Sequence, residues 1–164
     1  ACEQHADFIF YSLSNFLKAS HEHFTLLKQT ISLLLTIVPL LETPTPHHAG
    51  NASEFAVVLL DALSRSAKVP IRQLYLRALT KHIDETLYFR AIPHLRRLLL
   101  CIGDHLRWPQ EELVEDTLQL LWVVNKHCWP RMLPRYISLM GDIIDRAISN
   151  DLKTSKPLQS WIEK

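Results

Sequence analysis

Hydrophobic residues recur along this chain at intervals of three and four positions, the spacing that places them on one face of an α-helix. The clearest example lies in residues 108–150, where two such stripes flank a short turn. The first stripe comprises Leu113, Leu120, Leu121 and Val124, and the second comprises Leu133, Ile137, Met140, Ile144 and Ala147. Two amphipathic helices joined by a short turn bury their stripes against each other, so the pattern predicts an antiparallel pair.

The same spacing predicts seven or eight helices over the whole chain. Their expected ranges are 5–18, 20–41, 53–66, 69–82, 84–105, 108–127, 134–149 (or 130–149) and 157–161. In the first helix, Phe8, Tyr11 or Ser12, and Asn15 or Phe16 lie on successive turns and form its expected apolar face. Residues 42–52 are rich in proline, threonine and glycine and predict a loop.

Particular residues predict where helices begin and break. Ser20 is expected to cap the second helix, and Pro70 suits the first turn of the fourth. Pro39 lies in the last turn of the second helix, where it is expected to end or kink it. Pro93 lies inside 84–105, and because proline has no amide hydrogen to donate, we expect a break there with a new segment starting at Pro93.

The helices group into pairs that recur with a period of about 40 to 50 residues, which is typical of stacked helical repeats. The units are 5–41, 53–82, 84–127 and a shorter one from 129 onward. We therefore predict an all-α, HEAT-like α-solenoid forming a single domain over residues 1–164, with a closed helix bundle as the alternative. Because Ala1 is no initiator methionine and a helical pattern starts almost at once, we expect a fragment of a longer chain.

Composition and charge narrow the classes of function. Only three glycines are present, which disfavours strands and tight hairpin turns, and the net charge of +1 gives no field that would attract nucleic acid along the whole chain. The cysteine count is odd, with Cys2, Cys101 and Cys128 in no metal-binding spacing, as expected in a reducing compartment. The most apolar run, residues 31–41, is shorter than a membrane span, so we expect a soluble intracellular protein without membrane contact.

Catalytic and metal-binding patterns are not found. The nine histidines include His21 and His23, whose side chains diverge on a helix, and the loop pair His47 and His48. The remaining candidates, His82, His94, His105 and His127, lie near helix ends, where an imidazole can bond terminal carbonyls. No phosphate-binding loop or nucleophile motif is present, and Cys101 lies in a leucine-rich run typical of a core. We expect no enzyme activity, metal or cofactor.

Two groups of residues are candidates for binding. The first is the turn formed by His127, Trp129, Pro130 and Arg131, since tryptophan and arginine are enriched in interface hot spots. Its structural alternative is that Trp129 wedges between two helices and Arg131 donates to carbonyls at the end of the sixth helix. The second group is basic: Arg90, His94, Arg96, Arg97 and Arg107. Its alternative is a solvated face paired with acids of neighbouring helices.

The segment from Leu118 to Arg131 resembles the C-terminal region of the Tel-two-interacting-protein-two family. It begins with the pattern Leu-x-Leu-Leu-Trp and ends with His-Cys-Trp-Pro-Arg. The family turn His-x-Trp-Pro-Arg matches His127, Trp129, Pro130 and Arg131. The helices over 71–79 and 11–41 also resemble that family. The resemblance covers nearly the whole chain and the C-terminal half of a family member, and Pro93 and Pro134 depart from the smoother helices expected there.

The resemblance implies a non-catalytic helical-repeat scaffold, the smaller Tel-interacting subunit of the TTT (Triple T) co-chaperone complex. Its partners would be the large helical-repeat Tel-interacting subunit and the Tel subunit. Through them it would support Hsp90-dependent maturation of phosphatidylinositol-3-kinase-related kinases in cytoplasm and nucleus. The alternative is a helical interaction domain of a larger protein that contacts phosphate or nucleic acid through Arg90, Arg96, Arg97 and Arg107.

Overall fold

The computed structural model describes residues 2–19, 23–41, 50–107 and 110–149, and within them every regular element is a helix and no strand occurs. The α-helices are α1 (Cys2–Lys18), α2 (Phe24–Leu41), α3 (Asn51–Arg65), α4 (Val69–His82), α5 (Leu95–Arg107), α6 (Glu111–Cys128) and α7 (Pro134–Ser149). Three further helical turns are η1 (Ile83–Leu87), η2 (Tyr88–His94) and η3 (Trp129–Arg131). The predicted all-α class is confirmed.

The contacts within the chain divide it into two compact units, Ala1–Leu87 and Tyr88–Lys164. The first unit holds α1 to α4 and η1, and the second holds η2, α5, α6, η3 and α7. Each unit has its own buried apolar residues, so each is described by itself. The single domain over 1–164 stays a prediction.

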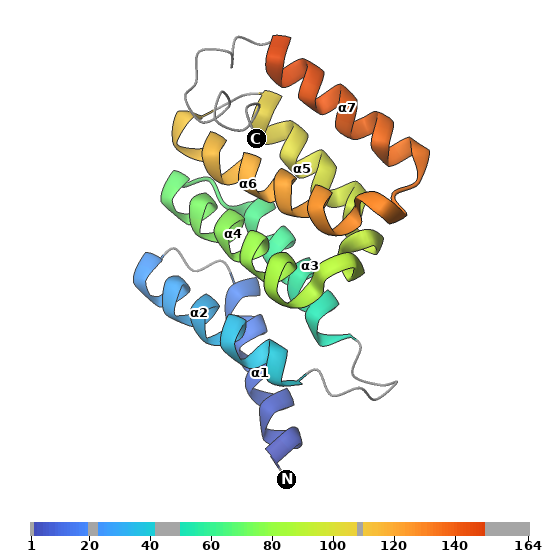
Figure 1. The fold of residues 1–164 in the computed structure, drawn as a ribbon. Coiled ribbons are helices and arrows are strands. Elements are labelled where there is room, and N and C mark those ends of the chain that lie inside the picture. The colour runs from blue at the N-terminus through green and yellow to red at the C-terminus, as the bar shows by residue number, and fades with distance from the viewer. Residues whose placement is uncertain (1, 20–22, 42–49, 108–109, 150–164) are drawn as a thin grey trace. The chain divides into compact units, whose positions relative to one another are not determined.

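In the first unit the helices form two stacked pairs (Figure 1). Helix α1 packs against α2 and α3 packs against α4, and then α1 lies on α3 and α2 lies on α4. A four-helix bundle would also bring the first helix beside the last, but among the described residues α1 and α4 form no comparable contact. First-on-first and second-on-second stacking is the arrangement of a helical repeat, which the sequence alone did not distinguish from a bundle.

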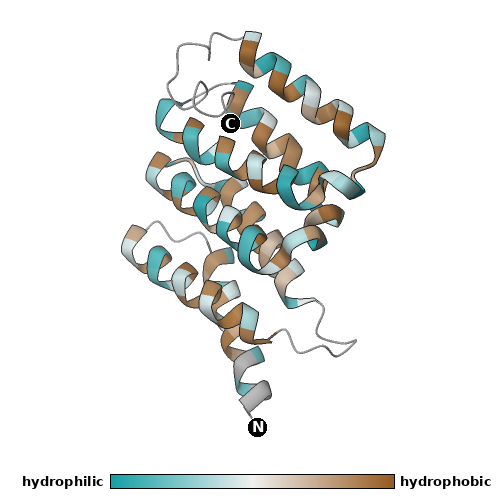
Figure 2. Ribbon diagram, viewed as in Figure 1, coloured by the Kyte–Doolittle hydropathy of each residue, from teal (hydrophilic) through white to brown (hydrophobic). Residues whose placement is uncertain are grey.

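The core of the first unit consists of large apolar side chains from all four helices, among them Phe10, Leu27, Leu34, Phe55 and Leu76, each fully buried. Figure 2 shows both hydrophilic and hydrophobic stretches on each helix, as expected for amphipathic helices that bury one side. Full burial of a residue such as Leu or Phe contributes about 1.5–3 kcal/mol each, so these stripes hold the pairs together.

The expected apolar face of α1 was wrong. The buried residues are Phe10, Ser14 and Leu17, whereas Phe8 is 72% exposed and Tyr11 is also exposed. The expected residues, which begin at Phe8, and the buried residues, which begin at Phe10, both follow helical spacing. Both choices are possible because the sequence is apolar or aromatic at every position from 8 to 11. Periodicity alone therefore allowed two stripes, and the position of the neighbouring helices decided between them.

Helix α2 is apolar over a greater length than the eleven-residue run considered in the sequence. By length and composition alone it is long enough to cross a membrane, although the core helix of a soluble protein passes the same test. In the first unit α2 packs against α1, α3 and α4 through buried residues that include Leu27, Leu34 and Val38. Pro39 lies within its last turn, and the helix ends two residues later at Leu41.

The predicted break in 84–105 is confirmed, and it is longer than expected. After α4 the chain makes one wide π-helical turn, η1, then the tighter 3₁₀ turns of η2, and α5 begins only at Leu95. Pro93 lies near the end of η2, two residues before α5, where its missing amide hydrogen interrupts no α-helical hydrogen bond. Pro70 occupies the first turn of α4 as predicted.

In the second unit α5 packs against both α6 and α7, while η2 and η3 pack against α6. The predicted packing of the two stripes against each other is wrong, because α7 packs on α5, and among the described residues α6 and α7 form no comparable contact. The residues of the first stripe, Leu113, Leu120, Leu121 and Val124, are all buried. The second is partly wrong. Met140 and Ala147 are buried, but Ile143 replaces Ile144 as a buried residue and Leu133 is exposed. Leu133 precedes the first residue of α7, so it lies outside the helical face that contacts α5.

Other expected boundaries differ by one to four residues. Helix α3 begins at Asn51 rather than Ser53, so the last residues of the predicted loop 42–52 are helical, and Ser66 follows α3 as its C-cap. Helix α6 has Gln110 as its N-cap. Ser20, residues 42–49, the beginning of the predicted helix 108–127 and the predicted helix 157–161 lie outside the described residues.

Candidate interaction surface

The turn that resembles a known family connects α6 to α7. Helix α6 ends at Cys128, and the amide of Trp129 still donates to the carbonyl of Asn125. Pro130 has no amide hydrogen to continue this ladder, so the chain tightens into the 3₁₀ turn η3. The amide of Met132 closes the turn on the carbonyl of Trp129 at 3.2 Å, and α7 then starts at Pro134.

Trp129 and Arg131 lie at the surface. The Trp129 side chain is 48% exposed, so it does not form the buried wedge between two helices that was the structural alternative. The guanidinium of Arg131 lies over the Phe89 ring, with its carbon 4.6 Å from the ring centroid. Arg131 therefore makes a cation–π contact with η2 in place of the expected hydrogen bonds to the last carbonyls of α6.

A second contact joins the same two segments. The rings of Tyr88 and His127 meet edge to face, with their centroids 5.4 Å apart. Tyr88 has a backbone φ of 52°, the left-handed region that bulky residues rarely adopt. Such a conformation costs on the order of 1–3 kcal/mol and is most often found at functional sites and switch regions. It occurs here where the π-helical η1 gives way to the 3₁₀ turns of η2.

The residues of these two contacts, together with Trp129, which lies between His127 and Arg131 in the chain, form a group that we call the aromatic–arginine cluster: Tyr88, Phe89, His127, Trp129 and Arg131. The three large aromatic side chains are each nearly half exposed. Tyrosine, tryptophan and arginine are the residue types most enriched in protein-interface hot spots, because they offer a large rigid contact area with a polar group attached. The cluster is therefore suited to binding another protein surface.

Sequence reasoning found the half of this cluster that comes from the turn and missed Tyr88 and Phe89. Those two residues are about forty positions earlier in the chain and were assigned to the helical segment that precedes the predicted break at Pro93. The only sequence signal for them was the helix break predicted at Pro93, five residues after Tyr88. A break indicates that nearby apolar residues lie off the helical stripe, but it does not indicate which turn they contact.

The predicted basic group is spread over η2 and α5. Arg90 and His94 are half-buried in η2, while Arg96, Arg97 and Arg107 are exposed on α5. Burial, followed by the charge of Arg97, holds the pKa of His94 below its ordinary value. Arg107 lies at the far end of α5, beside a groove that also includes Arg146.

The thiols and buried histidines have structural contacts. Burial raises the pKa of the Cys128 thiol to about 11, so at neutral pH it is not a nucleophile. Nδ1 of His105 lies 2.7 Å from the carbonyl oxygen of Cys101, which can only accept, so this nitrogen carries the hydrogen and cannot serve as a base for the Cys101 thiol. His105 thus bonds the carbonyl of the residue one turn earlier inside α5, and not one of the terminal carbonyls that were predicted.

His82 at the end of α4 also bonds a carbonyl, but one from another helix. Its Nε2 lies 2.7 Å from the carbonyl oxygen of Ala52, and its ring meets Phe55 edge to face. The contact ties the end of α4 to the beginning of α3. Among the described residues no group of three or more histidine, cysteine, aspartate or glutamate side chains could hold a metal ion. His21, His47 and His48 lie outside those residues, and His23 is exposed.

The chain is similar to one characterised human protein. It is 26% identical to TELO2-interacting protein 2 of Homo sapiens in an alignment 149 positions long, which covers 85% of this chain and 28% of the human protein. This supports a distant relationship over most of the chain. The chain spans little more than a quarter of that relative, not the half that was expected. No family model and no solved structure match the chain.

Proposed function

We propose that this chain is a non-catalytic helical-repeat scaffold segment of a TTT-type co-chaperone complex. It would bind the large helical-repeat Tel-interacting subunit and the Tel subunit. Through that assembly it would support the Hsp90-dependent maturation and stability of phosphatidylinositol-3-kinase-related kinases, in the cytoplasm and nucleus. Its own role is to present a surface, with no bound cofactor or metal.

The observation that carries this proposal is the aromatic–arginine cluster. It includes the Trp-Pro-Arg turn by which the chain resembles the family, and Tyr88 and Phe89 of η2 contact His127 of α6 and Arg131 of η3. The similarity to human TELO2-interacting protein 2 extends over most of the chain and supports the same reading.

The test is direct association with the two proposed partners. The chain is co-expressed with the large Tel-interacting subunit and the Tel subunit, and the complex is isolated. Calorimetry then measures the affinity of the separately purified chain for these partners. We expect a stable complex, and Trp129→Ala should weaken it by about tenfold or more, as expected for a hot-spot residue.

Trp122→Ala is the matched control. Trp122 is also on α6 and is 44% exposed, close to the exposure of Trp129, but it lies outside the cluster. It should leave the affinity within about twofold of the unaltered chain. The proposal fails if the chain and its partners do not associate at micromolar concentration, or if both tryptophan substitutions have the same effect.

A further inference from the structure

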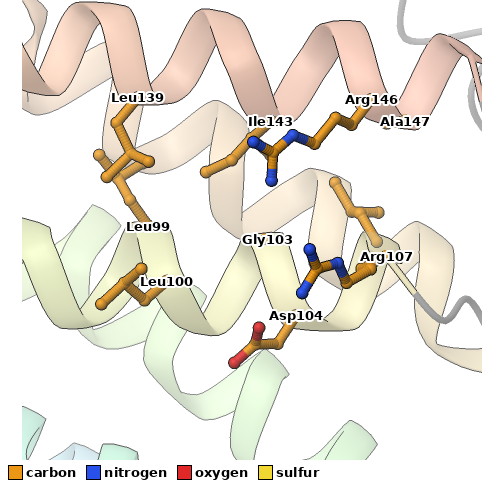
Figure 3. Close-up of a pocket in the computed structure, with 10 residues that line it drawn as sticks. Leu99, Leu100, Gly103, Asp104, Arg107, Leu139, Ile143, Arg146 and Ala147 are labelled. Carbon is orange, nitrogen blue, oxygen red and sulfur yellow. The ribbon is translucent and has the colours of Figure 1, made fainter.

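A groove of about 160 Å³ lies between α5 and α7 of the second unit (Figure 3). Its apolar part is lined by Leu99, Leu100, Leu139 and Ile143. Figure 3 shows Arg107 and Arg146 together at the opposite end, with Asp104 on the α5 side. The groove therefore changes from apolar to basic along its length.

The two helices run in the same direction beside this groove. Figure 3 shows Leu139 of α7 next to Leu99 and Leu100 of α5, and Arg146 next to Arg107. Both helices place an arginine seven residues after a leucine, Leu100 to Arg107 and Leu139 to Arg146, a rise of about 10 Å. The apolar and basic ends of both helices are thus in register.

Gly103 lines the groove between the apolar Leu100 and the basic Arg107 of α5. A Cβ atom at this position would lie 3.3 Å from Cγ1 of Ile143, so the glycine lets α7 approach α5 closely. Leu100 is exposed although it is large and apolar, which leaves apolar surface open at one end of the groove. An exposed apolar strip bounded by charges is typical of a protein-binding groove.

The charges show what kind of partner fits. Arg107, Arg146 and Asp104 are all exposed and all line the groove. Two guanidinium groups against one carboxylate give this end a net positive charge. A guanidinium has five donors in a planar fork that matches a carboxylate, so acidic side chains are the groups that this end would bind.

We propose that the groove between α5 and α7 binds an amphipathic helix of a partner protein, whose first turn is acidic and whose next two turns carry leucine-type residues. The acidic turn would lie against Arg107 and Arg146, and the apolar residues would cover Leu100 and Leu139. Binding a helix through its apolar face in a groove is a common mode of peptide recognition.

The helix dipoles favour one direction for that partner. The arginine end of the groove is the C-terminal end of both α5 and α7, where unpaired carbonyls give a partial negative charge. The positive N-terminal end of the bound helix is therefore favoured there, which makes it antiparallel to α5 and α7. Acidic side chains are also favoured in the first turn of a helix, so the same residues stabilise the bound helix itself.

The probe for the test is a fluorescein-labelled, alanine-based helical peptide with glutamates in its first turn and leucines one and two turns later. Binding to the full chain is measured by fluorescence anisotropy. We expect saturable binding that weakens about tenfold with Arg107→Glu/Arg146→Glu and falls as salt is raised. Leu100→Lys should weaken it as well, and because Leu100 is exposed this change should not unfold the chain.

A charge swap separates recognition from a structural effect. The Arg107→Glu/Arg146→Glu protein should gain affinity for a second peptide in which lysines replace the glutamates. The matched control is Arg96→Glu/Arg135→Glu, which makes the same charge change at exposed positions of α5 and α7 outside the groove and should not alter binding. No saturable binding up to millimolar peptide, equal effects of the two double variants, or no gain for the lysine peptide would each overturn the proposal.

This inference does not depend on the proposed co-chaperone role, because the test uses a model peptide and substitutions outside the aromatic–arginine cluster. If the peptide fails to bind while Trp129→Ala still weakens the TTT-type complex, the groove proposal alone is rejected. If the groove variants bind an oligonucleotide less well than the unaltered chain does, the groove contacts phosphate and not an acidic helix, which also rejects it.

Discussion

At the scale of single residues, the contribution of a large aromatic side chain to stability depends on how much of it is buried. Phe55 and Trp129 are both large and aromatic, but Phe55 is fully buried in the first unit and Trp129 is nearly half exposed in the second. Only the buried ring leaves a cavity when it is truncated. The aromatic residue that stabilises the fold and the aromatic residue offered for binding can therefore be separated experimentally.

We expect Phe55→Ala to lower the free energy of unfolding by about 3–5 kcal/mol, because it removes a fully buried ring and leaves a cavity. Trp129→Ala should cost less, about 2 kcal/mol or below, since about half of its contact area is already in water. Urea denaturation of the two variants measures both values. Equal losses would mean that Trp129 is a core residue after all.

The contact between Arg131 and Phe89 has a separate measurable energy. The guanidinium lies over an exposed ring, so its coupling energy should be about 0.5–1 kcal/mol. A double-mutant cycle of Arg131→Ala and Phe89→Ala isolates that energy from the rest of each substitution. A coupling of zero would show that the two side chains do not interact in solution.

At the scale of elements, the second unit contains two glycines inside helices in different surroundings. Gly103 of α5 lies against Ile143 of α7, whereas a Cβ added to Gly141 of α7 would meet nothing within 4 Å. A glycine inside a helix costs about 0.5–1 kcal/mol relative to alanine, so replacement helps wherever space allows.

Gly141→Ala should therefore raise the stability by about 0.5–1 kcal/mol, measured as a higher melting temperature or urea midpoint. Gly103→Ala should gain less or lose stability, because its Cβ requires the end of the Ile143 side chain to move by a few tenths of an ångström. The difference between the two variants measures how tightly α5 and α7 pack. A Gly103→Ala gain as large as that of Gly141→Ala would contradict the close approach.

At the scale of the whole molecule, one histidine gives the stability a predictable pH dependence. Burial and the nearby charge of Arg97 lower the pKa of His94 in the folded protein. The unfolded chain then takes up the proton first as the pH falls below about 6.5, the ordinary value for histidine. Protonation of His94 thus favours the unfolded state, and the folded state loses stability as the pH falls through that range.

We expect His94→Gln to reduce the loss of stability between about pH 7 and pH 5, because glutamine does not titrate in that range. Urea denaturation at several pH values gives the free energy of unfolding of both proteins. The two curves should run parallel above pH 7 and diverge below it. Curves that stay parallel down to pH 5 would show that His94 titrates equally in the folded and unfolded states.

The sequence by itself determined the helices, because each has an apolar stripe at helical spacing, and prolines such as Pro70 and Pro93 mark local starts and breaks. Those signals are local, involving neighbours within a few residues. Only the tertiary structure decided which of two stripes α1 buries, that α1 lies on α3 and not beside α4, and that Phe89 lies under Arg131. Each depends on residues distant in the chain, and periodicity carries no information about which faces meet.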